Sequence, residues 1–287
     1  MCKIKHGWYR DFKKILLRKD QPIGFFMFNY PYLVELLPPK RSAGDQVEGL
    51  LDRFAERYQK IIDAGYGLSI PDNPMGQPRF GALESIDLRG LSVNPKKIVM
   101  NLNTFHTKSE LDGLLQKAAK ANLKYILVVR GDGGPLLPKL DSKSIGGKQS
   151  VATSIDLIRY INTQYPDQFI TGAAFNPYKP MPFELDRMKQ KIGAGAKYLI
   201  TQPITGKDDN VDKLKDFNIT VVVEAWMSNN ISLLYKSIGK EKDEKAEKYD
   251  PVENLKALHK YYPECCVYLS MLSFKQDWKE ILPRQST

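Results

Sequence analysis

Polar residues end two apolar runs of the chain, and their types could bind a ring-shaped ligand. Arg130, Gly131 and Asp132 follow the run "KYILVV", and Thr201 and Gln202 close the run "YLI". A glycine lets a ring approach the backbone closely. An amide offers a donor and an acceptor together, and a carboxylate accepts from amino groups, so both can match the edge of a heterocycle. These residues predict a site for a planar, nitrogen-rich ring.

Other kinds of catalytic site find less support in the sequence. A metal centre needs three or four converging ligands, and the acidic residues Asp72, Asp132 and Glu224 do not have the spacing of a metal motif. The hydrolase motif G-x-S-x-G is missing, and His106 is the one histidine near an expected strand end. We therefore predict neither a metal site nor a catalytic triad.

Composition narrows the class of protein. The chain has 287 residues, of which 42% are hydrophobic, and it has no run of about 18 apolar residues that would span a membrane. Its basic N-terminus lacks the apolar segment of a secretion signal. The net charge of +10 is spread along the chain, which favours a small anion or an acidic partner over nucleic acid. The three cysteines form no disulfide or zinc pattern, so we expect a cytoplasmic protein.

Strand-like and helix-like segments alternate along the chain. Short apolar strands with helices between them are typical of parallel pairing, and eight such units in this length predict a single (β/α)8 TIM barrel. A doubly wound open sheet is the alternative. We expect a basic helical extension over 1–20, a barrel over 21–287 and a mobile loop or lid over 133–149. The expected strands are 22–29, 66–70, 96–103, 124–129, 169–175, 197–201, 219–226 and 265–272.

The carboxyl ends of the barrel strands must then carry the site. Amides and aromatic rings dominate these ends, and aromatic rings supply stacking faces for a ligand. The candidates for binding the substrate are Tyr30, Asp132, Asn176, Thr201, Gln202 and Trp226.

Two segments resemble the methylenetetrahydrofolate reductase family. "LKYILVVRGDGG" and "MKQKIGAGAKYLITQP" match the family's R-G-D strand end and its K-x-x-AGA-x-x-x-TQ block, and "SIPDNPMGQPR" at 69–79 resembles its strand-two segment. The resemblance implies a folate-binding TIM barrel of one-carbon metabolism, with FAD as cofactor. It places Asp132 near the flavin and the pterin, and Gln202 on the pterin edge. The flavin contacts that it implies are Arg130, Gly131, Asn101, Phe175, Lys179 and Lys191.

Several positions depart from the family pattern. The family's first strand reads close to S-F-E-F-F-P-P, and its glutamate is the acid that opens the methylene bridge. We align "GFFMFNYP" with this strand, which puts Phe26 at the glutamate and predicts that Glu224 or Asp72 replaces it. The family's flavin-contacting threonine, histidine and tyrosine align with Pro71, Asn101 and Phe175, which argues against FAD.

Two activities follow from this pattern. The first is a reductase that interconverts 5,10-methylenetetrahydrofolate and 5-methyltetrahydrofolate, with Asp132 and Glu224 as catalytic residues and a flavin, a nicotinamide or an electron-donor subunit supplying the hydride. The alternative is a flavin-free methyltransferase that passes a methyl group between tetrahydrofolate and a corrinoid protein or another acceptor. A non-enzymatic folate-binding role is the third hypothesis.

Overall fold

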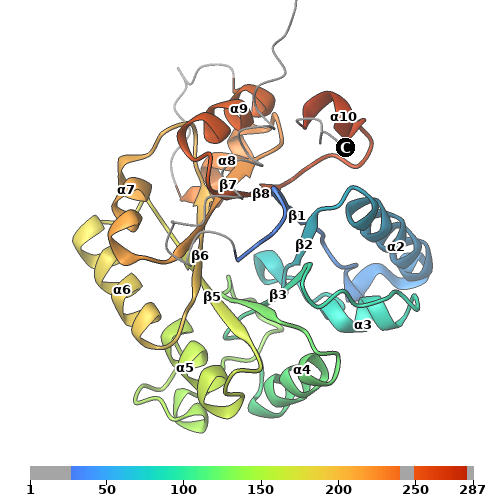
Figure 1. Ribbon diagram of the computed structural model, residues 1–287. Helices are drawn as coiled ribbons and strands as arrows, with labels where there is room; N and C mark the ends of the chain where they lie inside the picture. The colour runs from blue at the N-terminus through green and yellow to red at the C-terminus, as the bar shows by residue number, and fades with distance from the viewer. Residues whose placement is uncertain (1–26, 240–248, 283–287) are drawn as a thin grey trace, which may run out of the picture.

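Eight parallel strands close into a barrel in the computed structural model, which describes residues 27–239 and 249–282 (Figure 1). Each strand pairs with its neighbours in chain order, and β8 pairs with β1. The predicted TIM barrel is therefore confirmed. The strands are β1 (Tyr32–Glu35), β2 (Gly67–Ile70), β3 (Ile98–Leu102), β4 (Tyr125–Val128), β5 (Ile170–Phe175), β6 (Tyr198–Pro203), β7 (Thr220–Trp226) and β8 (Cys266–Ser270).

The prediction of the first strand is wrong, whereas the other seven lie where the sequence predicts them. The barrel strand is "YLVE" at Tyr32–Glu35, and the described part of 22–29, which starts at Met27, contains no strand. Phe28 and Tyr30 are buried among the side chains that fill the barrel lumen. Aromatic residues are enriched in strands, but here they enter the barrel from the end opposite to the strand carboxyl termini.

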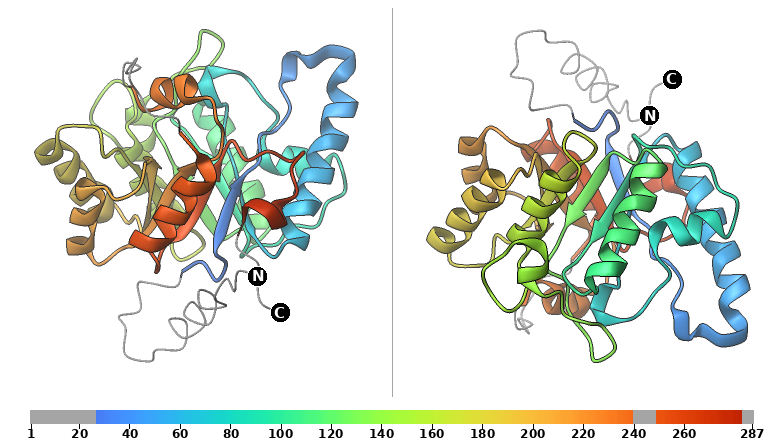
Figure 2. Two further views of the ribbon diagram at one scale, coloured as in Figure 1. Left: turned by 90° about the horizontal axis from the view of Figure 1, so that it is seen from above. Right: turned by 90° about the horizontal axis from the view of Figure 1, so that it is seen from below.

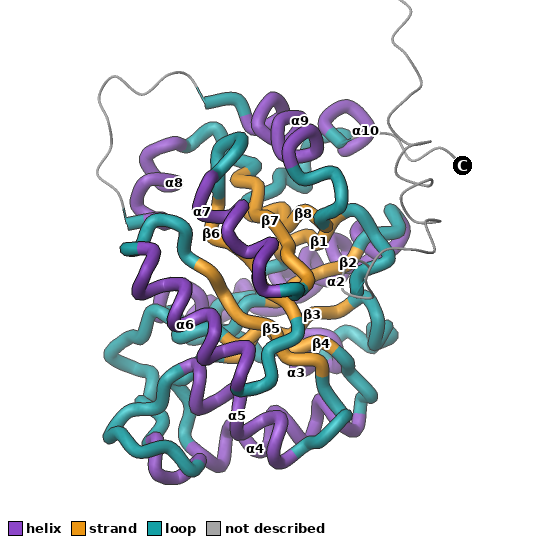
Figure 3. Tube along the Cα trace, turned by 60° about the vertical axis from the view of Figure 1, so that its left-hand side comes forward, coloured by secondary structure: helices purple, strands orange, loops and turns teal. Residues whose placement is uncertain are grey.

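Helices surround the strands on the outside in every view (Figures 2 and 3). Several begin at side-chain caps, such as Thr107, whose hydroxyl accepts from the N–H of Glu110 while the carboxylate of Glu110 accepts from the N–H of Thr107. Within the described ranges, no helix is long and apolar enough to cross a membrane. The α-helices are α2 (Val47–Asp63), α3 (Ala82–Asp87), α4 (Lys108–Lys120), α5 (Ser154–Gln164), α6 (Met181–Gly193), α7 (Asp209–Asp212), α8 (Ile231–Ile238), α9 (Pro251–Tyr261) and α10 (Trp278–Ile281), with shorter 3-10 turns at Arg41–Gln46, Pro74–Gly76, Ser142–Ile145 and Lys213–Phe217.

The core has two layers, one between strands and helices and one inside the lumen. The lower lumen holds an aromatic cluster in which Phe28 contacts Tyr30, Tyr125 and Tyr198, with ring centroids 5.0–5.6 Å apart. Gly67 makes room for the ring of Tyr30, because a Cβ at this position would overlap it. The aromatic cluster therefore closes the N-terminal end of the lumen.

The loop after β4 is attached to the barrel. The N–H of Leu140 donates to the carbonyl of Thr104 at 3.0 Å, and the N–H of Ala152 donates to the carbonyl of Leu140 at 2.9 Å. Leu140 is buried, as are two residues of the short turn Ser142–Ile145. The second half of the predicted lid at 133–149 therefore packs on the barrel. The predicted N-terminal helix at 1–20 lies outside the described residues.

Candidate active site

Polar side chains lie above the apolar lumen, at the carboxyl ends of the strands. Side chains two residues apart on a strand share a face. Glu35 therefore lies above the lumen-facing Leu33 on β1, Gln202 above Ile200 on β6, and Glu224 above Val222 on β7. The apolar members of these pairs are buried, and the polar members above them are partly exposed. The top of the lumen is therefore a polar cup that solvent reaches from the C-terminal side.

Glu35 lies in this cup with two hydrogen-bond donors. The hydroxyl of Tyr268 donates to Oε1 of Glu35 at 3.2 Å, and the backbone of Met271 bonds the same carboxylate. Burial raises the pKa of Glu35, although both hydrogen bonds and the charge of Arg79 act against this increase. A carboxyl group that keeps its proton to higher pH at the solvent-exposed end of a barrel is suited to general acid catalysis.

Glu224 provides a second carboxyl group in the cup. Burial raises its pKa well above the usual range and the charge of Glu35 raises it further, while a hydrogen bond from Ser270 lowers it. The hydroxyl of Thr201 accepts from the backbone N–H of Glu224 at 2.9 Å, at the point where the pairing of β6 and β7 shifts register. Thr201 is buried, so its hydroxyl positions β7 and is not available to a substrate, contrary to the expectation from the sequence.

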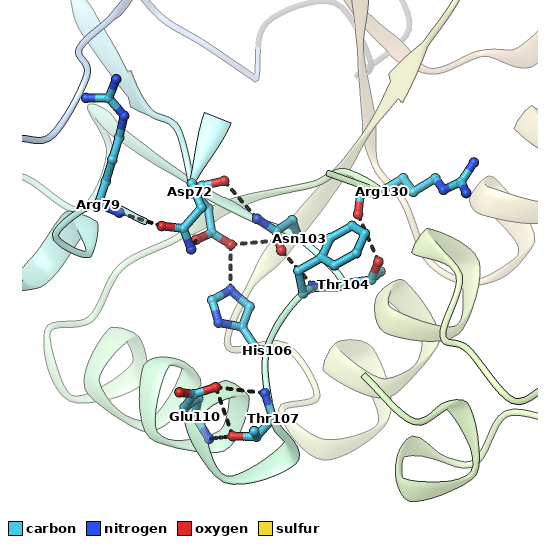
Figure 4. A network of polar contacts seen from close by, with 10 residues as sticks. Asp72, Arg79, Asn103, Thr104, His106, Thr107, Glu110 and Arg130 are labelled. Atoms are coloured by element: carbon cyan, nitrogen blue, oxygen red, sulfur yellow. Dashed lines mark hydrogen bonds and ion pairs between the residues drawn. The ribbon is translucent and has the colours of Figure 1, made fainter. Parts of the chain in front are cut away.

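Asp132 fixes one wall of the cup. Its Oδ2 accepts from the backbone N–H of Met75 at 2.7 Å, which ties the loop after β4 to the loop after β2. Asp132 is exposed, and Gly131 before it has φ +83°, a conformation that favours glycine. Arg130 is also exposed, and its side chain extends away from the neighbouring polar network (Figure 4).

That network is centred on Asp72 (Figure 4). Oδ2 of Asp72 lies 2.7 Å from Nε2 of His106 and accepts from the N–H of Asn103 at 2.9 Å. Burial lowers the pKa of His106, but the hydrogen bond and charge of Asp72 outweigh burial, and the net pKa is raised. Asp72 therefore holds β3 and its loop in place, and its carboxylate is already engaged.

We expect Asp72→Asn to destabilise the protein more at pH 6 than at pH 9. The raised pKa of His106 contributes stability below its ordinary value of about 6.5, and this contribution is lost as pH rises through the folded pKa. Hydrogen bonds to charged groups contribute roughly 1.5–3 kcal/mol, so the substitution should cost about 1–2 kcal/mol at pH 6. Urea unfolding at both pH values measures this difference. The exposed Asp87→Asn is the control, and an equal loss at both pH values would contradict the assignment to His106.

Three residues expected at the site lie elsewhere. Tyr30 precedes β1 and belongs to the aromatic cluster at the N-terminal end of the lumen. Phe175 is fully buried in the layer between strands and helices. Lys191 is buried between α6 and β5, where its Nζ donates to the carbonyl of Ala174 at 2.6 Å. Burial lowers the pKa of Lys191 to about 8, partly offset by the charge of Glu184.

Other expected residues do reach the region of the cup. Asn176 is partly exposed after β5, and its amide oxygen accepts from the N–H of Tyr178 at 2.9 Å. Asn101 is partly exposed on β3 and accepts from the hydroxyl of Ser69 at 2.8 Å. At the end of β7, Trp226 is buried, and its indole Nε1 has no hydrogen-bond partner among the described residues.

Two of the residues aligned with the family's flavin contacts do not face the carboxyl end of the lumen. Phe175 faces the helices, and the ammonium group of Lys191 is already bonded to the barrel backbone. Pro71, at the family's threonine position, has no hydroxyl or N–H to donate. The exposed Arg130 and Lys179 could meet phosphate groups, but they do not define a place for the ring. Across the described ranges, no three His, Cys, Asp or Glu side chains gather as metal ligands.

The sequence contains a signal for Glu35 that the alignment of 24–31 overlooks. "LVELLPP" at 33–39 follows the family pattern S-F-E-F-F-P-P with the glutamate at Glu35. Phe26, which the alignment of 24–31 puts at the glutamate, lies outside the described residues. The position of β1 corrects the alignment, because Glu35 ends the first barrel strand and the two prolines follow it.

Comparison with known proteins agrees with the corrected alignment. The profile of the family described as methylenetetrahydrofolate reductase matches residues 30–228, so the match begins just before β1. Methylenetetrahydrofolate reductase 1 of Schizosaccharomyces pombe is 28% identical over 215 residues, which are 69% of this chain and 34% of that protein. Methylenetetrahydrofolate reductase 2 of Saccharomyces cerevisiae is 28% identical over 193 residues, which are 63% of this chain and 30% of that protein.

Solved structures resemble the barrel more distantly. The 7,8-dihydropteroate synthase of Vibrio fischeri superposes with a TM-score of 0.45 at 14% identity, covering 88% of this chain and 90% of that one. The chain spans about a third of the length of the two yeast reductases. The profile match over more than half of the sequence shows that this chain belongs to the methylenetetrahydrofolate reductase family.

Proposed function

We propose that the protein reduces the methylene bridge of 5,10-methylenetetrahydrofolate to the methyl group of 5-methyltetrahydrofolate. The observation that carries this proposal is the position of Glu35, which ends β1 inside the cup with its pKa raised by burial. Family membership adds the substrate class, because the two yeast relatives are named for this reduction.

Each residue of the cup has a distinct role in this proposal. Glu35 donates a proton to the bridge nitrogen that leaves the methylene carbon, which opens the bridge to an iminium ion. Gln202 bonds the pterin edge through its amide, and Asp132 faces the ring from the loop after β4. A hydride donor taken up from solution then reduces the iminium carbon, and the apolar lumen below the cup limits access of water to that carbon.

The methyltransferase alternative loses one of the two observations that favoured it. It rested on the absence of an acid from the first strand, where Glu35 stands, and on the replacement of the family's flavin contacts by Pro71, Asn101 and Phe175, which remains. Glu224 is likewise not needed as the replacement acid. A basic surface remains compatible with an acidic partner, but a net charge of +10 does not distinguish a corrinoid protein from a polyglutamylated folate.

An anaerobic assay with 5,10-methylenetetrahydrofolate tests the proposal. The purified protein is supplied with NADH or NADPH, with and without added FAD, and 5-methyltetrahydrofolate is measured together with the visible absorbance of the protein. Turnover supports the proposal, and the dependence on FAD identifies the hydride donor. A protein that binds 5-methyltetrahydrofolate but shows no turnover under any of these conditions, and demethylates it with a corrinoid acceptor, contradicts the proposal.

Gln202→Leu should weaken the binding of 5-methyltetrahydrofolate by roughly 10- to 100-fold, because a paired donor and acceptor are lost in a partly buried site. The side chains are similar in size, so the stability of the barrel should change little. Titration calorimetry measures the affinity. Gln164→Leu at the exposed end of α5 is the matched control, and unchanged affinity of the Gln202 variant would place the pterin elsewhere.

A further inference from the structure

Tyr268 reaches Glu35 from the neighbouring strand of the barrel. On β8, Tyr268 is the register partner of Leu33 on β1, and Glu35 lies two residues beyond Leu33 on the same face. The side chain of Tyr268 is buried in the lumen, and its hydroxyl donates to Oε1 of Glu35 at 3.2 Å. Tyr268 therefore connects the apolar lumen to the carboxyl group above it.

The strand on the other side of Glu35 offers no competing side-chain donor. The register partner of Glu35 on β2 is Ser69, which is fully buried and donates its hydroxyl hydrogen to Oδ1 of Asn101 at 2.8 Å. Ser69 also approaches the hydroxyl of Tyr268. A tyrosine has one hydroxyl hydrogen, however, and a carboxylate accepts it more strongly than a serine hydroxyl does. Among the described residues, Tyr268 is therefore the side chain that donates to Glu35.

The two oxygens of the Glu35 carboxyl group differ in their contacts. Oε1 accepts from Tyr268, and within the described ranges no side chain donates to Oε2. Each carboxyl oxygen has two lone-pair sites, so the backbone bond from Met271 leaves room for a proton on Oε2. The other groups that interact with the carboxyl group by charge are Arg79 in the loop after β2 and Glu224 on β7.

We propose that Tyr268 is the positioning residue for the acid: its hydroxyl holds Oε1 of Glu35, so that Oε2 carries the proton to the bridge nitrogen of the folate. The O–H bond on Oε2 breaks as an N–H bond forms. The bond from that nitrogen to the methylene carbon then breaks, and its electron pair stays on the nitrogen. Hydrogen bonds to charged acceptors are shorter than those to neutral ones, so the bond from Tyr268 should tighten as the carboxylate forms. This role rests on the proposed function through the use of Glu35 as the acid.

The kinetics of Tyr268→Phe test this role, because the substitution removes the hydroxyl and keeps the ring. For the reduction, kcat should fall roughly 10- to 100-fold with KM within a few-fold of the wild type, since the acid is no longer held in place. The alkaline fall of kcat should begin about one pH unit higher, because the lost hydrogen bond favoured the ionised acid.

Tyr198→Phe is the matched control for the kinetics. Tyr198 is another tyrosine of the lumen, and its hydroxyl has no hydrogen-bond partner among the described residues. This variant should keep both kcat and the alkaline limb of the wild type. An unchanged kcat in Tyr268→Phe, or a lower kcat with an alkaline limb that does not move, would overturn the positioning role.

A titration without substrate tests the hydrogen bond itself. Protein labelled with ¹³C at the glutamate side-chain carboxyl carbon is titrated by NMR, and Glu35→Gln identifies the resonance of Glu35. In Tyr268→Phe the midpoint of Glu35 should rise by about one pH unit, whereas Tyr198→Phe should leave it unchanged. A midpoint that stays the same in Tyr268→Phe would show that the hydroxyl does not hold the carboxylate, and the proposal would fail.

A second titration uses the wild-type chain and so remains decisive if Tyr268→Phe does not fold. With ¹³C at Cζ of tyrosine, one tyrosine resonance should shift with the midpoint of Glu35 and lose this shift in Glu35→Gln. The absence of such a resonance would overturn the proposal. A wild type without turnover would contradict the proposed function and the catalytic role of Tyr268 together, whereas the two titrations still decide whether Tyr268 holds Glu35.

Discussion

Glu35→Gln is expected to lower kcat for the reduction of 5,10-methylenetetrahydrofolate by roughly 10²- to 10⁴-fold, the usual contribution of a general acid. The glutamine keeps the shape of the side chain and can still accept from the hydroxyl of Tyr268, but it cannot donate a titratable proton. We therefore expect the affinity for 5-methyltetrahydrofolate, which needs no bridge opening, to stay within a few-fold of the wild type. Anaerobic turnover and titration calorimetry measure the two quantities separately.

Two comparisons make this result specific to the acid. Glu84→Gln changes a partly exposed glutamate at the start of α3, away from the lumen, and should keep full activity. Glu224→Gln should also retain activity, because Glu35 and not Glu224 is the proton donor in the proposed reaction. If Glu35→Gln were as active as the wild type, the acid that opens the bridge would have to be another residue.

Gly76→Ala is expected to destabilise the protein by roughly 2–4 kcal/mol, a large effect for a single methyl group. Gly76 has φ +66°, and a Cβ there would overlap the carbonyl oxygen of Gly133 in the loop after β4. The two loops approach each other backbone to backbone at this point, and the nearby bond from Met75 to Asp132 depends on that approach. Chemical denaturation gives the change in unfolding free energy.

The expected loss of stability in Gly76→Ala has two causes, the left-handed backbone conformation and the overlap with the loop after β4. Gly90→Ala separates them. Gly90 has a similar φ of +57°, but nothing lies within 4 Å of the place that the added methyl group would occupy. Its substitution should cost only the left-handed strain, about 1–2 kcal/mol. Equal losses of unfolding free energy in the two variants would mean that the loops after β2 and β4 can move apart without a cost in stability. A larger loss for Gly76→Ala, with weaker folate binding, would show that the contact holds Asp132 in place.

Hydrophobic pattern was sufficient to predict most of the barrel. The runs at 124–129 and 219–226 are apolar on both faces because each strand packs on the lumen and on a helix, and this burial makes them recognisable. The first strand failed because 22–29 is also apolar, and periodicity does not distinguish a strand from a segment that fills the lumen. "YLVE" is four residues long and gives a weaker signal than the aromatic run before it.

The candidate site was harder to predict from the sequence than the fold. Glu224, Gln202 and Asp132 could be predicted as candidates because each lies at or just after the carboxyl end of a strand that the pattern located correctly. Glu35 was missed because its strand was misplaced. Phe175 was named as a flavin contact only through the family alignment, and its side chain lies on the helix-facing side of β5. The neighbours that set the pKa of Glu35 come from β8 and from the loop after β2, so no local stretch of sequence contains them.

The aromatic cluster closes the N-terminal end of the lumen. Phe28 and Tyr198 are almost completely buried there, so within the described residues Glu35 is open to solvent from the C-terminal rim. In the proposed reaction the hydride donor and the folate would therefore share one entrance, and a large excess of either should block the other.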